Sequence, residues 1–401
     1  MRVLFVSDVY FPRVNGVSTS IRTFREDLSR EGVETRLVAP EYSSDNSVAY
    51  EGAPQGFDPS GVLRVNGKRV PFDPEDRRMS WRSLTAALDG LDGSEFDLVH
   101  IHTPFVAHYA GVRFARRAHL PCLATYHTFF EEYLHHYVPL LPHLLARFLA
   151  RSFTRSQCAA VQGLIAPSEP MRAVLKAYGV RTPIHVVPTG LPADRFRPGD
   201  GRAFRARAGI PAERPLVLYV GRVAHEKNIG FLVQVFREVH QRLPEALLVI
   251  AGEGPARESL MREVAALGLG HDVHFAGYLE RDAALLDCYA AADVFVFASR
   301  TETQGLVLLE AMAQGAPVVS TAELGSRSIL VPESGALVVP EDKDAFARAV
   351  ERVLTDGELR AALRARCRAY ARSWSSLAMA QRLAQVYAEL HRAPHTARAT
   401  A

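Results

Sequence analysis

Short runs of apolar, often β-branched residues recur along the chain and are separated by polar or amphipathic stretches. In the first half they occupy residues 3–6, 35–39, 97–101, 121–125 and 163–166, and in the second half 216–220, 246–251, 273–276, 294–298 and 317–321. Such short runs are typical of buried strands in parallel sheets. Amphipathic stretches predict helices over 18–30 (with Ser18 as its N-cap), 232–242, 306–314 and 375–393.

Two successive series of strand–helix units predict an α/β chain with two Rossmann-like, doubly wound parallel sheets facing a cleft. The turn-rich stretch 188–199 is the natural boundary between them. We expect one domain over 1–192, a second over 193–372, and a helix and tail over 373–401 that pack back toward the first. The polar, Gly/Pro-rich region 41–72 is interpreted as a mobile loop system. Ligands of such sheets bind at the carboxyl ends of strands, so residues directly after strands matter most.

Composition excludes several classes of protein. The 401 residues are 48% hydrophobic and 23% charged, which is typical of a globular chain, and the net charge of +3 disfavours a nucleic-acid binder. The four cysteines form no C-x-x-C pair, so neither a disulfide framework nor a thiolate zinc site is indicated, and a reducing cytoplasm is expected. The N-terminus lacks a signal-peptide core and no apolar stretch spans a bilayer, so any action on membranes would be from the surface.

The strongest candidate motif follows the predicted strand 294–298. Glu302 lies in the loop, Gly305 and Leu306 open a helix, and Glu310 lies about one turn into it. The backbone N–H groups of a helix start favour an anion such as phosphate, and carboxylates accept hydrogen bonds from sugar hydroxyls. The alternative is an acidic first turn that only stabilises the helix dipole.

A second motif follows the strand 216–220. Arg222 and Lys227 lie in one loop that begins at Gly221, and together they offer a cationic clamp for a diphosphate. Such a clamp would stabilise the charge that develops on a leaving group. The alternative is a pair of solvated surface charges.

Two residues of the first series are further candidates. Gly16, in the loop after the first strand, permits close approach of a phosphate, although a simple turn explains it too. His127 follows the strand 121–125 and should point into the cleft, whereas His135 and His136 are interpreted as structural. No G-x-G-x-x-G, P-loop or H-E-x-x-H pattern is present, which disfavours a dehydrogenase, a P-loop enzyme and a zinc peptidase. The D-x-D at 342–344 is better explained by helix capping than by a metal ion.

Three of these motifs, in this order and spacing, resemble those of the retaining glycosyltransferases of family four. They are Gly221-Arg222 with Lys227, the run Gly252-Glu253-Gly254-Pro255, and Glu302 with Glu310 eight positions later. The resemblance covers nearly the whole chain. It implies the GT-B fold, with the acceptor on the side of the N-terminal domain, a nucleotide sugar held mainly by the C-terminal domain, and neither a metal nor another cofactor.

The resemblance also implies a role for each matching residue. Arg222 and Lys227 would clamp the donor diphosphate, and Glu302 would hold hydroxyls of the transferred sugar. The other implied donor contacts are Gly305 and Leu306 through backbone N–H groups, Glu310 at the ribose, Gly277 and Tyr278 at the base, Gly16 at the phosphate, and His127 beside the sugar. Retention would follow from front-face attack on an oxocarbenium-like state, with the leaving phosphate as base.

The run 127–137, with 15–20 and 301–305, is similar to bacterial diacylglycerol glycosyltransferases. Phosphatidylinositol mannosyltransferases instead place Phe where this chain has Gln304. Between 105 and 181 there are nine basic and three acidic residues. Arg147, Arg151 and Arg155 repeat every four residues among leucines, which is typical of a cationic amphipathic helix on an anionic membrane. A second membrane contact is expected at Arg77, Arg78, Trp81 and Arg82.

These observations predict hexosyl transfer from UDP-glucose or UDP-galactose to a lipid acceptor such as diacylglycerol. The protein would be cytoplasmic and peripheral on the inner face of the cell membrane. Alternatives are a soluble or other cell-envelope acceptor, a nucleotide-sugar epimerase, and, for the basic helix, an ordinary solvated face.

Overall fold

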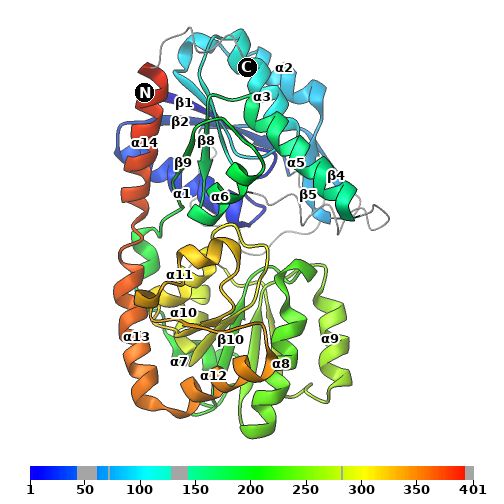
Figure 1. Ribbon diagram of the computed structural model, residues 1–401, viewed down its shortest axis with the longest axis vertical. Coiled ribbons are helices and arrows are strands. Elements are labelled where there is room, and N and C mark those ends of the chain that lie inside the picture. The colour runs from blue at the N-terminus through cyan, green and yellow to red at the C-terminus, as the bar shows by residue number, and fades with distance from the viewer. Residues whose placement is uncertain (43–60, 71–72, 128–142, 281–282, 393–401) are drawn as a thin grey trace. The chain divides into compact units, whose positions relative to one another are not determined.

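The computed structural model describes residues 1–42, 61–70, 73–127, 143–280 and 283–392. By its internal contacts the chain divides into two units (Figure 1). Unit 1 comprises Met1–Gly190 together with the segment from Ser376, and unit 2 comprises Leu191–Ser375. The Rossmann-like fold predicted for each half is confirmed.

Unit 1 is built on a seven-stranded parallel sheet of order β3-β2-β1-β6-β7-β8-β9. Its strands are β1 (Arg2–Val6), β2 (Glu34–Pro40), β3 (Val62–Val65), β6 (Leu98–Ile101), β7 (Cys122–Thr125), β8 (Gly163–Ala166) and β9 (Ile184–Val186). Its helices are α1 (Gly16–Arg30), α2 (Trp81–Asp89), α3 (Val106–Arg117), α5 (His143–Ala159), α6 (Glu169–Ala177) and α14 (Ser376–Arg392). With this strand order, the right-handed crossovers that are the rule in parallel sheets place α2, α3, α5 and α6 on the face opposite α1. Helix α14 packs beside α1.

The last helix completes the core of unit 1. Leu383 and Tyr387 of α14 are buried in the same apolar cluster as Phe5 of β1 and Phe24 of α1. The segment Ser376–Arg392, which follows all of unit 2 in the sequence, thus packs against the first sheet (Figure 1).

Two predictions for unit 1 were wrong in detail. The first helix begins at Gly16, and its N-cap is Asn15, whose side chain accepts a hydrogen bond from the Ser18 amide, in place of the predicted Ser18. The region 41–72 is not wholly irregular, because it contains β3 and β4 (Gly67–Val70); β4 pairs antiparallel with β5 (Asp73–Met79). The sequence pattern did not predict these strands because turn-forming residues surround them. Residues 43–60 and 71–72 of this region lie outside the described ranges.

Unit 2 has a six-stranded parallel sheet of order β12-β11-β10-β13-β14-β15. Its strands are β10 (Leu216–Val220), β11 (Leu247–Ala251), β12 (Val273–Gly277), β13 (Val294–Phe297), β14 (Val318–Ser320) and β15 (Leu337–Val338). Its helices are α7 (Gly201–Arg207), α8 (Ile229–Arg242), α9 (Arg257–Ala266), α10 (Ala283–Ala291), α11 (Leu306–Ala313), α12 (Lys343–Thr355) and α13 (Gly357–Ala371). Asp342 is the N-cap of α12 and accepts from the Ala345 amide, so the capping interpretation of the D-x-D is confirmed.

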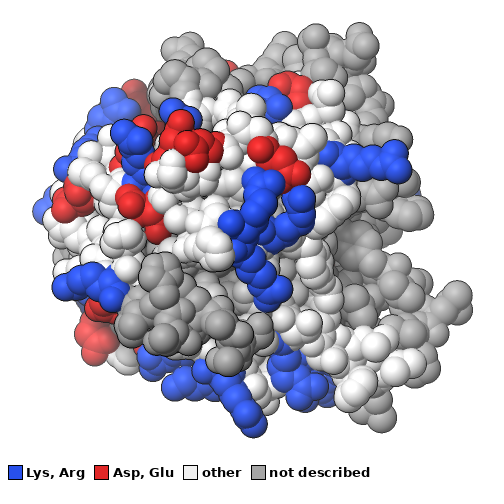
Figure 2. All heavy atoms as spheres, turned by 90° about the horizontal axis from the view of Figure 1, so that it is seen from above, with Lys and Arg blue, Asp and Glu red and all other residues white. Residues whose placement is uncertain are grey.

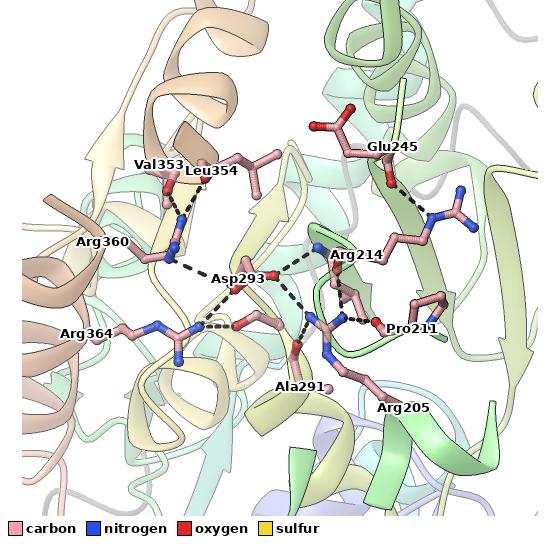
Figure 3. Close-up of polar contacts among 12 residues, drawn as sticks. Arg205, Pro211, Arg214, Glu245, Ala291, Asp293, Val353, Leu354, Arg360 and Arg364 are labelled. Atoms are coloured by element: carbon pink, nitrogen blue, oxygen red, sulfur yellow. Dashed lines mark hydrogen bonds and ion pairs between the residues drawn. The ribbon is translucent and has the colours of Figure 1, made fainter. Parts of the chain in front are cut away.

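A network around Asp293 ties together the amino ends of the central strands of unit 2 (Figure 3). The Asp293 carboxylate accepts from Arg205 at 3.0 Å and from the Leu216 amide at 3.0 Å, and Arg364 lies 3.5 Å away. Arg205 also donates to the carbonyl oxygens of Ala291 and Pro211. The guanidinium of Arg205 is buried, and it is paired and hydrogen-bonded as a buried charge must be. The network fixes the scaffold at the end opposite the carboxyl ends of the strands.

The surface is mixed in charge. On the face drawn in Figure 2, Lys and Arg are interspersed with Asp and Glu, which agrees with the small net charge. Within the described ranges no helix is both long and apolar enough to cross a bilayer.

Candidate functional site

The centre of the unit 2 sheet is its topological switch point, because β10 pairs with β11 on one side and with β13 on the other. The loops after β10 and β13 meet here. Lys227 Nζ, from the first loop, lies 2.7 Å from Glu302 Oε2, from the second, and the two side chains are 19% and 22% exposed. The two strongest motifs in the sequence are thereby brought together, at the position where open α/β sheets bind ligands.

Glycines allow the loop after β10 to lie against the loop after β11. A Cβ on Gly252 would lie 2.0 Å from the Gly221 carbonyl oxygen, and one on Gly254 would lie 2.4 Å from the Val223 carbonyl oxygen. Two backbone hydrogen bonds between Val223 and the second loop hold this close contact. The G-E-G-P run therefore shapes the backbone that carries Arg222 and Lys227.

A second bridge joins the loops after β10 and β13. Asn228, in the left-handed conformation at φ 57°, donates 3.3 Å hydrogen bonds to the Ala298 carbonyl and to Glu341. Glu341 also accepts from Arg300, 2.9 Å from Nε to Oε2, and this hydrogen bond holds the pKa of Glu341 below its usual range. The carboxylate of Glu226 lies 3.7 Å from Arg222. Each cation of the clamp thus has a carboxylate beside it.

The start of α11 completes this part of the site. Gly305 is its N-cap at φ 99°, a conformation that favours glycine, and Leu306 is its first residue. The helix start offers backbone N–H groups next to Glu302. Glu310, one turn further on, is only 3% exposed, and Tyr289 donates to its Oε2 at 3.1 Å. The hydroxyl of the buried Tyr289 thus orients the Glu310 carboxylate.

Gly277 is the last residue of β12 and Tyr278 follows it, two strands from β10 in the sheet. The Gly277 carbonyl accepts from the Gly252 amide at 2.7 Å, so this loop belongs to the same row of loops. The ends of β12, β11, β10 and β13 and the loops after them therefore form one continuous edge. It contains the donor-binding candidates of unit 2 except Leu306 and Glu310, which lie in α11.

Unit 1 has its own switch point, between β1 and β6. Asp8 follows β1, and its carboxylate accepts from the Thr103 hydroxyl at 2.8 Å and from the Ala107 amide at 3.1 Å. Burial raises the pKa of Asp8 to about 6, although these hydrogen bonds oppose the shift. Gly16, at the start of α1, has no atom within 4 Å of where a Cβ would be, so its side is open.

His127 follows β7 and stacks on His102, which follows β6, with 5.8 Å between ring centroids. Burial lowers the pKa of His127 to about 4, so its imidazole is neutral at physiological pH. The residues after it, including His135 and His136, lie outside the described ranges.

The basic residues considered for membrane contact lie on α5, β5 and α2. Arg147 and Arg155 are exposed, while the Arg151 guanidinium lies 5.0 Å from the centre of the Tyr178 ring. Arg77 and Arg78 belong to β5, and Arg77 lies over the ring of Tyr42. Trp81 and Arg82 begin α2, and both are exposed.

Several residues of these sites were not anticipated. Asp8 and His102 lie within two residues of the ends of β1 and β6, so their position in the sequence was an available signal. No such signal pointed to Asn228, Arg300 and Glu341, because their association depends on which strands are neighbours in the sheet.

Comparison with known proteins identifies relatives of this chain. Residues 14–195 match the model of glycosyltransferase family 4, and residues 200–374 match that of glycosyl transferases group 1. The chain is 32% identical over 328 residues to alpha-monoglucosyldiacylglycerol synthase of Streptococcus pneumoniae, covering 80% of this chain and 71% of that protein. It is 27% identical to the protein of the same name from Acholeplasma laidlawii, covering 80% of each.

Among solved structures, sucrose-phosphate synthase from Thermosynechococcus elongatus superposes with a TM-score of 0.78 at 22% identity, covering 97% of this chain and 98% of that one. This likeness shows the fold, which is GT-B. Taken with the family models and the pneumococcal relative, it leads to one identification: the chain belongs to glycosyltransferase family 4 and is a glycosyltransferase.

Proposed function

We propose that the protein transfers a hexosyl group from UDP-glucose or UDP-galactose to a lipid acceptor such as diacylglycerol, with retention of configuration, to give an α-glycosyl glycolipid. The observation that carries the proposal is the pairing of Lys227 with Glu302 at the switch point of unit 2. A cation for phosphate and a carboxylate for sugar hydroxyls lie within one hydrogen bond of each other there. The relatives named as monoglucosyldiacylglycerol synthases support the choice of sugar and acceptor.

The cations of unit 2 serve the donor diphosphate. Arg222 and Lys227 are each beside a carboxylate, Glu226 and Glu302, so an incoming diphosphate competes for cations that are already positioned. As the bond to the sugar breaks, negative charge grows on the diphosphate. Fixed cations and the amides of Gly305 and Leu306 stabilise that charge without reorganising, which is the largest contribution that many enzymes make.

The carboxylates and the remaining candidates orient the donor. Glu302 accepts from hydroxyls of the transferred sugar, and Glu310 accepts from the ribose. Gly277 and Tyr278 contact the base, and Gly16 approaches the phosphate. Neutral His127 donates to, or accepts from, the sugar, which it can do because burial keeps its ring uncharged.

Retention is proposed to occur by front-face attack. The acceptor hydroxyl attacks the anomeric carbon on the side from which the diphosphate leaves, and its proton passes to the leaving phosphate oxygen. No protein nucleophile is then required, and neither a metal nor another cofactor is needed, because side chains and helix amides supply the charge stabilisation.

A group of exposed apolar side chains supports the proposal of a lipid acceptor. Seven of the eleven exposed large apolar side chains among the described residues belong to α2, α5 and α3 with its N-cap. They are Trp81, Phe105, Tyr109, Leu145, Phe148, Leu149 and Phe153. Phe148, the most exposed at 62%, is on the same helix as Arg147, Arg151 and Arg155. Exposed apolar groups beside arginines are suited to the headgroup region of an anionic membrane.

The test is a screen of nucleotide sugars against vesicles that contain diacylglycerol and an anionic lipid, with identification of the product. We expect Arg147/Arg151/Arg155→Glu to weaken vesicle binding and transfer. The matched control is Arg262/Arg348/Arg372→Glu, which makes the same charge change at exposed positions of unit 2. Equal binding by both triple variants, or transfer only to water-soluble sugars, would favour a soluble or other cell-envelope acceptor. Conversion of the donor without any acceptor would identify an epimerase.

A further inference from the structure

Three imidazoles lie ring against ring behind the carboxyl edge of the unit 1 sheet; those of His100 and His102 are buried, and their planes are tilted by 34°. The ring centroids of His100 and His102 are 4.1 Å apart, and those of His102 and His127 are 5.8 Å apart with planes 24° from parallel. The ring of Phe5 closes the side of the stack, 4.5 Å from His102. Because interiors are close-packed, a shift of one ring in such a stack displaces the next.

Two hydroxyls fix the inner end of the stack. His100 Nδ1 lies 2.6 Å from the Tyr387 hydroxyl of α14, and its Nε2 lies 2.7 Å from the Thr125 hydroxyl of β7. With a partner on each nitrogen, the ring of His100 cannot turn about its Cβ–Cγ bond without losing a hydrogen bond. Tyr387 is fully buried, and its ring meets that of His100 edge to face.

The middle ring has no partner of this kind. His102 is 1% exposed, and among the described residues neither of its nitrogens has a hydrogen-bond partner. A buried polar group without a partner costs free energy that a hydrocarbon side chain would avoid. A hydrocarbon side chain would therefore fill this part of the core at a lower cost than His102. What His102 contributes is a flat ring that contacts both His100 and His127.

We propose that Tyr387 of the C-terminal helix is a positioning residue that orients His127 through the stack of His100 and His102. This inference rests on the proposed function, since it gives the proposed role of His127 a structural support. It means that α14, whose sequence follows the whole of unit 2, takes part in shaping the half-site on unit 1.

The test compares Tyr387→Phe with Val386→Ala in the full-length protein. Val386 is buried in the same helix and core but has no hydrogen-bonding group, so its truncation reports general loosening of α14. We expect Tyr387→Phe to lower kcat roughly tenfold with an unchanged donor KM, as expected for a misoriented catalytic group. In the protein without substrate, Tyr387→Phe should also shift the NMR signals of the His127 ring nitrogens. These signals are assigned by their loss in His127→Ala. Val386→Ala should lower Tm without either effect.

Unchanged His127 signals in Tyr387→Phe would overturn the proposal, and so would an unchanged kcat in that variant when His127→Ala has lost activity. The same changes in Val386→Ala would overturn it too. His102→Phe provides a second measurement, because it keeps a flat ring: it should retain most of the activity that His102→Ala loses. The NMR signals separate this inference from the proposed function. Wild-type turnover by His127→Ala would contradict the role given to His127 in the reaction, whereas the coupling of its ring to Tyr387 is read without any substrate.

Discussion

Removing either member of the Lys227–Glu302 pair should abolish efficient transfer but change nucleotide binding in opposite directions. At the observed 2.7 Å, and with an effective dielectric constant of about 20, the attraction of the pair is about 6 kcal/mol before the cost of dehydration. Dehydration offsets much of this, because both side chains are about four-fifths buried. The two residues therefore neutralise each other until a diphosphate arrives.

In Lys227→Ala the clamp loses a cation, and the carboxylate of Glu302 is left facing the phosphates. We expect kcat/KM to fall by about 10²–10³, which corresponds to about 2.7–4 kcal/mol of transition-state stabilisation. The affinity for UDP should also fall. In Glu302→Ala, transfer should fall comparably because the sugar is no longer oriented, but UDP should bind at least as tightly because Lys227 is released.

The measurements are initial rates of transfer to diacylglycerol vesicles and calorimetric titration with UDP. Arg242→Ala is the matched control, because it removes an ion pair with Glu351 of similar length, 3.1 Å, at the end of α8 and away from the switch point. Turnover near that of the wild type in either site variant would refute the assignment. A change of UDP affinity in the same direction in both variants would refute the charge reasoning.

Three further outcomes are expected. Asp293→Ala should lower the free energy of unfolding of unit 2 by about 2–4 kcal/mol, because Arg205 stays buried without its carboxylate partner. Chemical denaturation measures this change, and an unchanged denaturation midpoint would contradict the prediction. Gly252→Ala should reduce transfer more than roughly tenfold, since the new Cβ would lie 2.0 Å from the Gly221 carbonyl oxygen; wild-type kinetics would show that the loop after β10 is not so constrained. The raised pKa of Asp8 makes the folded state bind more protons between pH 3.8 and about 6, so stability falls as pH rises through that window. Asp8→Asn should therefore be more stable than the wild type at pH 7, by up to about 3 kcal/mol, with the advantage gone below pH 4, as thermal melts across pH would show.

The sequence alone determined where the strands and most of the helices lie. The runs at 163–166 and 216–220 agree with β8 and β10 to the residue, because a strand covered on both faces must be apolar along its whole length. The cap of α12 at Asp342 was predictable for a similar reason, since the residues that decide a helix start are neighbours in the chain. The motifs around Arg222 and Glu302 were also visible, because each is a short local run that follows a strand.

Only the tertiary structure decided which of these runs meet. Lys227 and Glu302 are 75 positions apart and touch because β10 and β13 are neighbours, although β11 and β12 come between them in the chain. Tyr387 reaches His100 across 287 positions because α14 returns to the first sheet. Strand order and helix return arise from the packing of whole layers, and no local pattern of apolar residues encodes them. The residues that carry the chemistry of this protein thus lie in short local segments, whereas the order of the strands in each sheet decides which of these segments meet.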